Sequence, residues 1–218
     1  MSVSQEFKET LIASEKKWQS KWDNAFTAKI NEDKQKYFIT IPYPYVTGNL
    51  HVGHGRTYTV TDFVARIKRL QGYNVLFPIA FHITGTPVLA ISNKLNDNDE
   101  ETIKLYEEYV NLYENDLEKS KQIVQTFKEP LKIVEYFSSK IIRDFKSVGY
   151  SMDFSRTFTT GEPYYNKFIE WQFKSYEEKG FLKKASYPIL FCPKDNNAVG
   201  EDEIKGGEDE KVEVQEWI

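Results

Sequence analysis

The spacing of apolar residues changes twice between residues 36 and 79. Residues 36–41 are a short run of mainly apolar and β-prone side chains, which is typical of a parallel strand buried on both faces. From about residue 49 to residue 70 the apolar positions recur at helical spacing, and those on one face are Val60, Phe63, Val64, Ile67 and Leu70. The pattern at residues 75–79 indicates a second strand. This βαβ order predicts a parallel α/β sheet with a right-handed crossover.

Helical patterns lie on both sides of this unit. Residues 5–22, 131–148 and 164–179 each carry an apolar stripe at helical spacing, and the composition of residues 181–191 favours a strand. The side chains expected to face the core are Phe7, Leu11, Trp18, Trp22, Val134, Phe137, Ile141, Phe145, Val148, Phe168, Trp171, Phe173 and Tyr176. Residues 96–129 are polar and rich in Glu and Lys, which predicts a peripheral helical hairpin.

The composition is that of an ordinary soluble protein. With 218 residues, of which 40% are hydrophobic and 28% charged, the chain can bury a sizeable core. A net charge of −4 gives no sign of the basic surface that is usual in nucleic-acid-binding proteins. A nucleic acid could still dock on another part of a larger protein.

Cysteine usage and hydropathy bear on the cellular compartment. Cys192 is the single cysteine, which excludes an intramolecular disulfide and fits a reducing environment. No apolar run approaches the roughly 20 residues that span a bilayer, and the first residues carry no signal-peptide pattern. We therefore expect a cytoplasmic protein with no membrane partner. The acidic stretch 201–216 leads to Ile218 without a closing strand, so the chain is expected to be truncated.

Two histidines mark the predicted start of the helix that follows the first strand. His51 and His54 are three residues apart, so both side chains project from one face of that helix. Gly53 lets a flat ring or a phosphate approach the backbone, and a helix N-terminus attracts anions. The pattern favours a phosphate site that could stabilise charge developing in a transition state.

Other interpretations of the histidines remain open at this point. Taken alone, the tetrapeptide 51–54 is explained equally well by two solvated histidines at a helix start as by a phosphate site. A zinc site could use all three histidines and Cys192, but this cysteine has no paired cysteine nearby. We therefore expect no metal ligands in this chain.

The two loops at 42–51 and 80–86 follow the two predicted strands. Ligands of open α/β sheets bind beyond the carboxyl ends of the strands, so both loops are expected to line one site. Thr86 is expected to cap the next helix, with Pro87 at its first position.

A longer stretch of sequence resembles a known family. Residues 42–54, Pro-Tyr-Pro-Tyr-Val-Thr-Gly-Asn-Leu-His-Val-Gly-His, resemble the signature of class I aminoacyl-tRNA synthetases. Residues 55–95, 149–156 and 167–173 are similar to leucyl-tRNA synthetases of the archaeal and eukaryotic type. The resemblance runs from about residue 5 to the end of the chain.

Two departures from related sequences refine the resemblance. His82 and Thr84 stand where the isoleucine and valine relatives carry Asp and His, which points to leucine specificity. The lysine-rich Lys-Met-Ser-Lys-Ser loop of the family is absent. In the family that loop belongs to the second half of the nucleotide-binding fold.

The resemblance implies an α/β chain with an incomplete Rossmann-like nucleotide-binding fold, a parallel sheet and a helical insertion. Residues 1–191 would form the N-terminal half of the catalytic domain, with 96–129 as a peripheral helical segment. Residues 192–218 would be the truncated lead-in to the editing insertion, so we expect no editing by this chain alone.

The resemblance also implies a reaction and a set of site residues. Leucine would be activated by ATP to leucyl-adenylate and passed to tRNA(Leu), with Mg²⁺ sharing the phosphoryl charge. The residues expected to take part are His51 and His54 as catalytic and ATP-binding groups, Gly53 and Asn49 at the ATP, Tyr43 and His82 at the amino acid, and Pro42, Pro44, Thr84 and Gly85 in its walls.

The implied partners are leucine, tRNA(Leu) and a C-terminal half, from the same gene or a second subunit. One alternative is a non-catalytic paralogue that binds ATP, leucine or a partner protein. Another is a class I ligase for methionine, valine or isoleucine.

Overall fold

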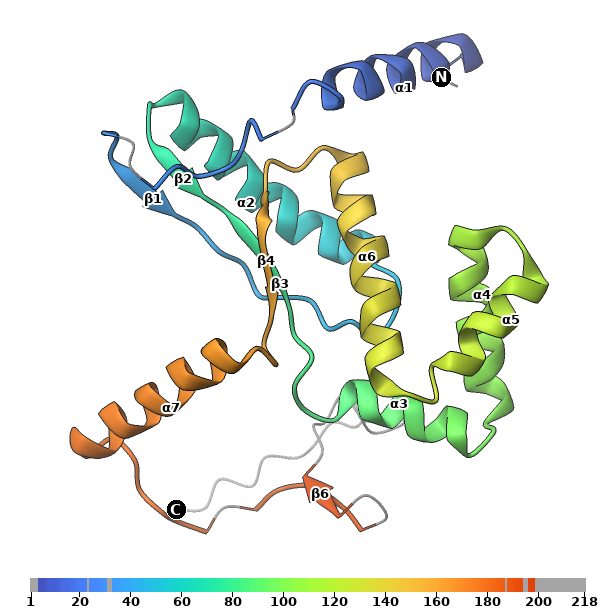
Figure 1. Cartoon of the computed structure of the whole chain (residues 1–218), viewed down its shortest axis with the longest axis vertical. Helices are drawn as coiled ribbons and strands as arrows, with labels where there is room; N and C mark the ends of the chain where they lie inside the picture. The colour runs from blue at the N-terminus through green and yellow to red at the C-terminus, as the bar shows by residue number, and fades with distance from the viewer. Residues whose placement is uncertain (1–3, 23, 31–32, 187, 194–195, 199–218) are drawn as a thin grey trace, which may run out of the picture. The chain divides into compact units, whose positions relative to one another are not determined.

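The computed structural model describes residues 4–22, 24–30, 33–186, 188–193 and 196–198. The chain divides into two compact units, Met1–Asn166 and Lys167–Ile218. The first unit contains a parallel sheet at its centre, and helices make up most of the rest of it (Figure 1). The expected α/β class with a parallel sheet is confirmed.

The sheet is built around the segment 74–81. Strand β1 (Lys36–Phe38) pairs in parallel with β2 (Asn74–Leu76), and β3 (Pro78–Phe81) pairs in parallel with β4 (Asp153–Thr159). Only Phe77 separates β2 from β3, and this residue is fully buried. The segment 74–81 is therefore a central strand with neighbours contributed by both earlier and later parts of the chain.

Helix α2 (Val52–Leu70) connects β1 to β2, which confirms the predicted βαβ unit. The apolar residues at helical spacing do not make up its buried face. The apolar side chains Val60, Phe63 and Leu70 are exposed, and the buried residues are Tyr58, Asp62 and Ala65. The Asp62 carboxylate accepts hydrogen bonds from the N–H and Oγ of Ser151, both at 2.6 Å. This polar interaction, which a count of apolar positions ignores, sets the orientation of the helix.

Four further helices follow β3 and lead to β4. They are α3 (Pro87–Asn96), α4 (Glu100–Glu114), α5 (Leu117–Thr126) and α6 (Pro130–Val148). Helices α4 and α5 pack on each other as the predicted hairpin, and Asp99 and Asp116 cap their N-termini. The hairpin and the turn after it add buried side chains to the main core, namely Tyr106, Val110, Val124 and Phe127.

Helix α6 has the apolar stripe that its sequence predicts. The buried residues of the stripe are Val134, Phe137, Ile141 and Phe145. Val148, in the last turn, is exposed. Gly149 ends the helix in the left-handed region (φ 86°), where a side chain would be strained.

The N-terminal helix α1 (Gln5–Gln19) begins at Ser4, whose side chain accepts a hydrogen bond from Phe7 N. None of its residues is buried, so the expected core stripe there was wrong for Phe7, Leu11 and Trp18. Trp22, which lies beyond the end of the helix, is half-buried.

Helix α7 (Pro163–Glu178) crosses into the second unit and has no buried residue. The inward placement expected for Phe168, Trp171, Phe173 and Tyr176 was therefore wrong. The described part of residues 181–190 forms no strand. Only β5 (Phe191–Cys192) does, in an antiparallel pair with β6 (Asn197–Ala198). Most of the predicted lead-in 192–218 lies outside the described residues.

No helix in the described part of the chain is both long enough and apolar enough to cross a membrane.

Candidate functional site

His51 and His54 meet at the N-terminus of α2. His51 is the N-cap residue in an extended conformation, and its Nδ1 accepts a hydrogen bond from the backbone N–H of Gly53 (3.0 Å). His54 Nδ1 accepts from the backbone N–H of His51 (3.3 Å), and the two ring centroids are 4.1 Å apart. The arrangement is a capping box with imidazoles in place of the usual hydroxyl and carboxylate.

These hydrogen bonds determine what the histidines can offer a ligand. A neutral imidazole that accepts at Nδ1 carries its proton on Nε2. Burial lowers the pKa of His54 from its usual value, and the neighbouring His51 lowers it further, which favours the neutral imidazole. The pair can therefore present Nε2–H donors beside the positive end of the helix dipole, which suits an anion.

The His51 ring lies close over the backbone of Gly53 at the helix start, so only glycine fits there without moving the ring. A Cβ on Gly53 would lie 2.7 Å from His51 Cε1 and 2.9 Å from its Nδ1. A side chain at position 53 would thus displace the ring from its capping position. Gly55, one residue beyond His54, has no such constraint, since its Cβ would be 3.9 Å from Tyr150 Oη.

The Pro-rich turn and the loop after β3 lie side by side. His82 N donates to the carbonyl of Pro44 (2.9 Å), and Tyr45 and His82 form a parallel β-bridge. Their rings stack with centroids 4.3 Å apart and planes at 18°. The hydroxyl of Tyr58 in α2 donates to the carbonyl of Pro42 (3.3 Å), which joins the turn to the helix of the histidine pair.

Thr160, which directly follows β4, holds the loop after β3. Its Oγ1 accepts from the backbone N–H groups of Ile83 (3.0 Å) and Thr84 (3.3 Å), and lies 3.1 Å from Thr84 Oγ1. Gly85 then turns in the left-handed region (φ 95°). Thr86 is the N-cap of α3, as expected, but its side chain makes no capping hydrogen bond.

Tyr43 contacts Phe158 of β4, which the sequence did not indicate. Its ring contacts Phe158 edge to face, with centroids 5.5 Å apart, and its hydroxyl accepts from Thr40 Oγ1 (3.2 Å). Phe158 and Thr160 were missed because strand β4 was not predicted. Residues 154–158 give no alternating apolar signal, because Arg156 stands between Phe154 and Phe158 on the same face.

The structure brings the expected residues together in two groups. One group is the histidine pair with Gly53, and the other is the turn at 42–45 with the loop at 82–85. Within the described residues no hydrogen bond or ring contact joins the side chains of these groups directly. Asn49 belongs to neither, because its Nδ2 donates to the carbonyl of Tyr109 in α4 (3.5 Å).

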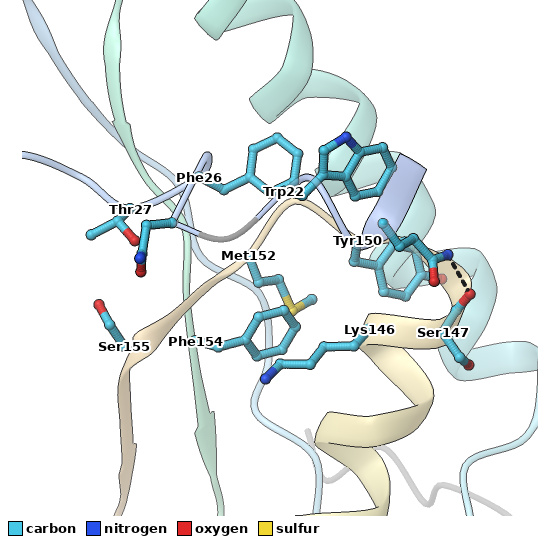
Figure 2. A pocket seen from close by; sticks show the side chains of 12 residues that line it. Trp22, Phe26, Thr27, Lys146, Ser147, Tyr150, Met152, Phe154 and Ser155 are labelled. Carbon is cyan, nitrogen blue, oxygen red and sulfur yellow. Dashed lines mark hydrogen bonds between the residues drawn. The ribbon is translucent and has the colours of Figure 1, made fainter. Parts of the chain in front are cut away.

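A pocket of about 460 Å³ lies elsewhere in the first unit (Figure 2). It is lined by Trp22 and Phe26, by Lys146 from the last turn of α6, and by Met152 and Phe154 at the start of β4. This is the amino end of β4, opposite the end at which ligands of open α/β sheets bind. The pocket is therefore separate from the two groups above.

Comparison with known protein families identifies the family of this chain. The family model for class I tRNA synthetases (I, L, M and V) matches residues 15–217. The chain belongs to this family.

Relatives within the class I synthetases support the resemblance to leucine enzymes. A leucine–tRNA ligase of Staphylothermus marinus is 46% identical over 214 residues, which cover 97% of this chain and 22% of that protein. A leucine–tRNA ligase of Thermoplasma acidophilum is 48% identical over 206 residues, which cover 93% and 22%. The chain thus spans about a fifth of the length of these curated relatives.

A solved structure shares the class I fold. It is the crystal structure of a ternary LeuRS-tRNA-LeuAMS complex from Agrobacterium radiobacter K84, with a TM-score of 0.54 and 21% identity. The match covers 88% of this chain and 21% of that chain. This similarity supports the fold, an incomplete Rossmann-like domain.

Replacing Gly53 with alanine should displace His51 without unfolding α2. Alanine gains about 1 kcal/mol of helix propensity over glycine, and the lost capping hydrogen bond costs a similar amount. The free energy of unfolding in urea should therefore change by less than about 1 kcal/mol. In ¹⁵N-edited spectra of the imidazoles, His51 should lose its preference for the Nε2–H tautomer. Gly55→Ala is the matched control, and an unchanged His51 tautomer in Gly53→Ala would contradict this account.

Replacing Thr160 with valine should loosen the loop at 82–85. The substitution removes the acceptor of the N–H groups of Ile83, which is half-buried, and Thr84, which is exposed. Each hydrogen bond contributes about 0.5–1.5 kcal/mol, so the two together contribute about 1–3 kcal/mol. Urea unfolding should show a loss of stability in this range, and amide exchange at Ile83 and Thr84 should accelerate. Thr160→Ser keeps the hydroxyl and should retain slow exchange at both amides. Equal exchange in the valine and serine variants would exclude this role for Oγ1.

Proposed function

We propose that this chain forms the N-terminal part of a leucine–tRNA ligase. The observation that supports the proposal best is the pair of imidazoles at the start of α2, each with its Nδ1 engaged by backbone and its Nε2 left for a ligand. The likeness to leucine–tRNA ligases at 46% and 48% identity agrees with it. The whole enzyme would be cytoplasmic, with ATP, leucine and tRNA(Leu) as substrates.

The activation step would need no nucleophile from the protein. A carboxylate oxygen of leucine attacks the α-phosphorus of ATP, and pyrophosphate leaves with the electrons of the broken P–O bond. The tRNA's terminal ribose hydroxyl then attacks the leucyl carbonyl of the adenylate, the acyl–phosphate bond breaks, and AMP leaves. His51 and His54 would donate Nε2–H to phosphate oxygens, and the N-terminus of α2 would stabilise the same charge. Positioning and electrostatics thus account for catalysis.

The second group of residues would form the leucine pocket. Tyr43 and His82 would hold the amino acid, with Pro42, Pro44, Thr84 and Gly85 in its walls. Support comes from the contacts that fix this group, namely the Tyr45–His82 stack and the hydrogen bonds from the 82–85 loop to Thr160. Asn49 is a weaker candidate for ATP binding, since its amide nitrogen already contacts α4.

Mg²⁺ would neutralise phosphate charge when ATP is bound. The described residues contain no group of three His, Cys, Asp or Glu side chains that could hold a metal ion. Mg²⁺ commonly binds through substrate phosphates and water rather than an all-protein cage. The ion would therefore enter with ATP, and this chain would act on the phosphates through His51 and His54.

The remainder of the enzyme would cover exposed apolar surface on α2. Val60 and Phe63 are 63% and 64% exposed, on the side of the helix opposite Tyr58 and Ala65. An exposed apolar stripe of this kind marks an interaction surface. The curated relatives are more than four times as long as this chain, so we assign the stripe to the second half of the catalytic domain.

Leucine-dependent exchange of pyrophosphate into ATP tests the proposal. We expect exchange when this chain is combined with a polypeptide that carries the remaining domains, and little or none with the chain alone. His51→Ala/His54→Ala should reduce the rate by about 100-fold or more, as loss of preorganised donors to a transition state does. Valine, isoleucine or methionine should not replace leucine.

Three results would contradict parts of the proposal. Exchange driven by another aliphatic amino acid would identify a different ligase of the family. No exchange in the complete mixture, from folded components, would favour a non-catalytic paralogue. Full exchange in the double alanine variant would remove the histidines from the phosphate site.

The docking assignment is tested by Val60→Asp/Phe63→Asp. Charges placed in a buried interface should weaken complementation by at least about tenfold, since a lost anchor residue costs more than 1.4 kcal/mol. The measurement is the concentration of the second polypeptide that gives half-maximal exchange. Leu112→Asp, on the exposed face of α4, is the control because Leu112 is 75% exposed. An equal shift in both variants would show that the stripe is not the interface.

A further inference from the structure

The loop that leads into the histidine pair is held by one turn of helix α4. The hydroxyl of Tyr106 donates a hydrogen bond to the carbonyl of Thr47. The ring of Tyr109 lies against Gly48, where a Cβ would be 3.0 Å from Cε2. The carbonyl of Tyr109 accepts from Asn49 Nδ2 (3.5 Å). Three consecutive loop residues are thus contacted by two tyrosines of the helical insertion.

Tyr106 is itself fixed by the core. Its side chain is only 4% exposed, and its ring makes edge contacts with Phe127 and Phe137 at 6.2 and 6.0 Å between centroids. Burial raises the pKa of Tyr106, so the hydroxyl stays protonated and remains a donor. The position of the Thr47 carbonyl therefore depends on packing between α4, α6 and the turn before α6.

Asn49 completes the attachment. Its Nδ2 is used by Tyr109, while its Oδ1 is buried without a hydrogen-bond partner among the described residues. A buried acceptor without a partner costs free energy, so the surrounding contacts must hold this side chain in place. Asn49 stands two residues before His51, and a small displacement of the loop would move the N-cap of α2.

We propose that Tyr106 and Tyr109 are positioning residues for the ATP-phosphate site, acting through Thr47, Gly48 and Asn49. The proposal rests on the proposed function, because it assigns the histidine pair to ATP. Neither tyrosine contacts the substrate in this account. The insertion instead sets where the imidazoles meet the phosphates, and catalysis by positioning is sensitive to displacements of about 1 Å.

A matched control lies on the same helix. Tyr113 also donates its hydroxyl from α4, to Asp144 Oδ2 in α6 (2.8 Å), but it contacts no part of the loop. Tyr106→Phe and Tyr113→Phe each remove one hydroxyl and one hydrogen bond. They should lower the melting temperature to a similar extent, so any difference in activity reflects the loop rather than stability.

The test measures leucine-dependent exchange of pyrophosphate into ATP, with this chain combined with the polypeptide that carries the remaining domains. Tyr106→Phe should reduce kcat/KM for ATP by about three- to tenfold, the effect of one lost hydrogen bond, and leave KM for leucine unchanged. Tyr113→Phe should match the unsubstituted protein in both constants. Equal kinetics of the two variants, or equal losses toward ATP and leucine, would overturn the proposal.

Amide hydrogen exchange on residues 47–51 gives a second readout that needs no activity. Tyr106→Phe should accelerate exchange in this loop, and Tyr113→Phe should not. If both variants left the loop unchanged, the positioning role would be refuted. If the unsubstituted protein showed no leucine-dependent pyrophosphate exchange, the proposed function would fail. Amide hydrogen exchange would still decide whether α4 holds the loop.

Discussion

The buried carboxylate of Asp62 fixes helix α2, and the candidate site depends on where this helix lies. The carboxylate accepts two hydrogen bonds from Ser151 and one from Arg66 Nε at 2.7 Å, and Arg66 also reaches the carbonyl of Gly149. A buried charge is tolerated only when it is paired and hydrogen-bonded, so this network strongly favours one orientation. His51 lies about three turns away on the same rigid helix. The turn before β4 therefore sets the direction in which the imidazoles project.

The same network explains why part of the fold was predictable and part was not. The change from strand to helical spacing identified β1, α2 and the central strand, because these elements repeat a simple period. The same spacing did not indicate which face of α2 is buried, since Asp62 and Tyr58 are buried with polar contacts while Phe63 remains exposed. Hydrophobic spacing detects a helix more reliably than it detects which polar side chains find buried partners.

The site shows a similar division between local and distant contacts. The contacts among His51, Gly53 and His54 all lie within four residues, so the motif was enough to predict that the two imidazoles lie together at the helix start, although not their capping hydrogen bonds. The supports of the neighbouring loops come from far along the chain. Thr160 is 77 residues from Ile83, and Tyr106 is 59 residues from Thr47. Pairing over such separations leaves no periodic signal, and both supports were missed.

The two groups of the candidate site depend on contacts of different range. The histidine pair needs only the first turn of α2 to form its capping box, so its local geometry can persist when distant contacts loosen. The loop at 82–85 relies on Thr160 for two backbone hydrogen bonds and loses its shape if β4 shifts. The loop at 46–50 relies in the same way on α4. The insertion and β4 are therefore parts of the site's framework, although neither supplies a residue that the sequence marks as functional.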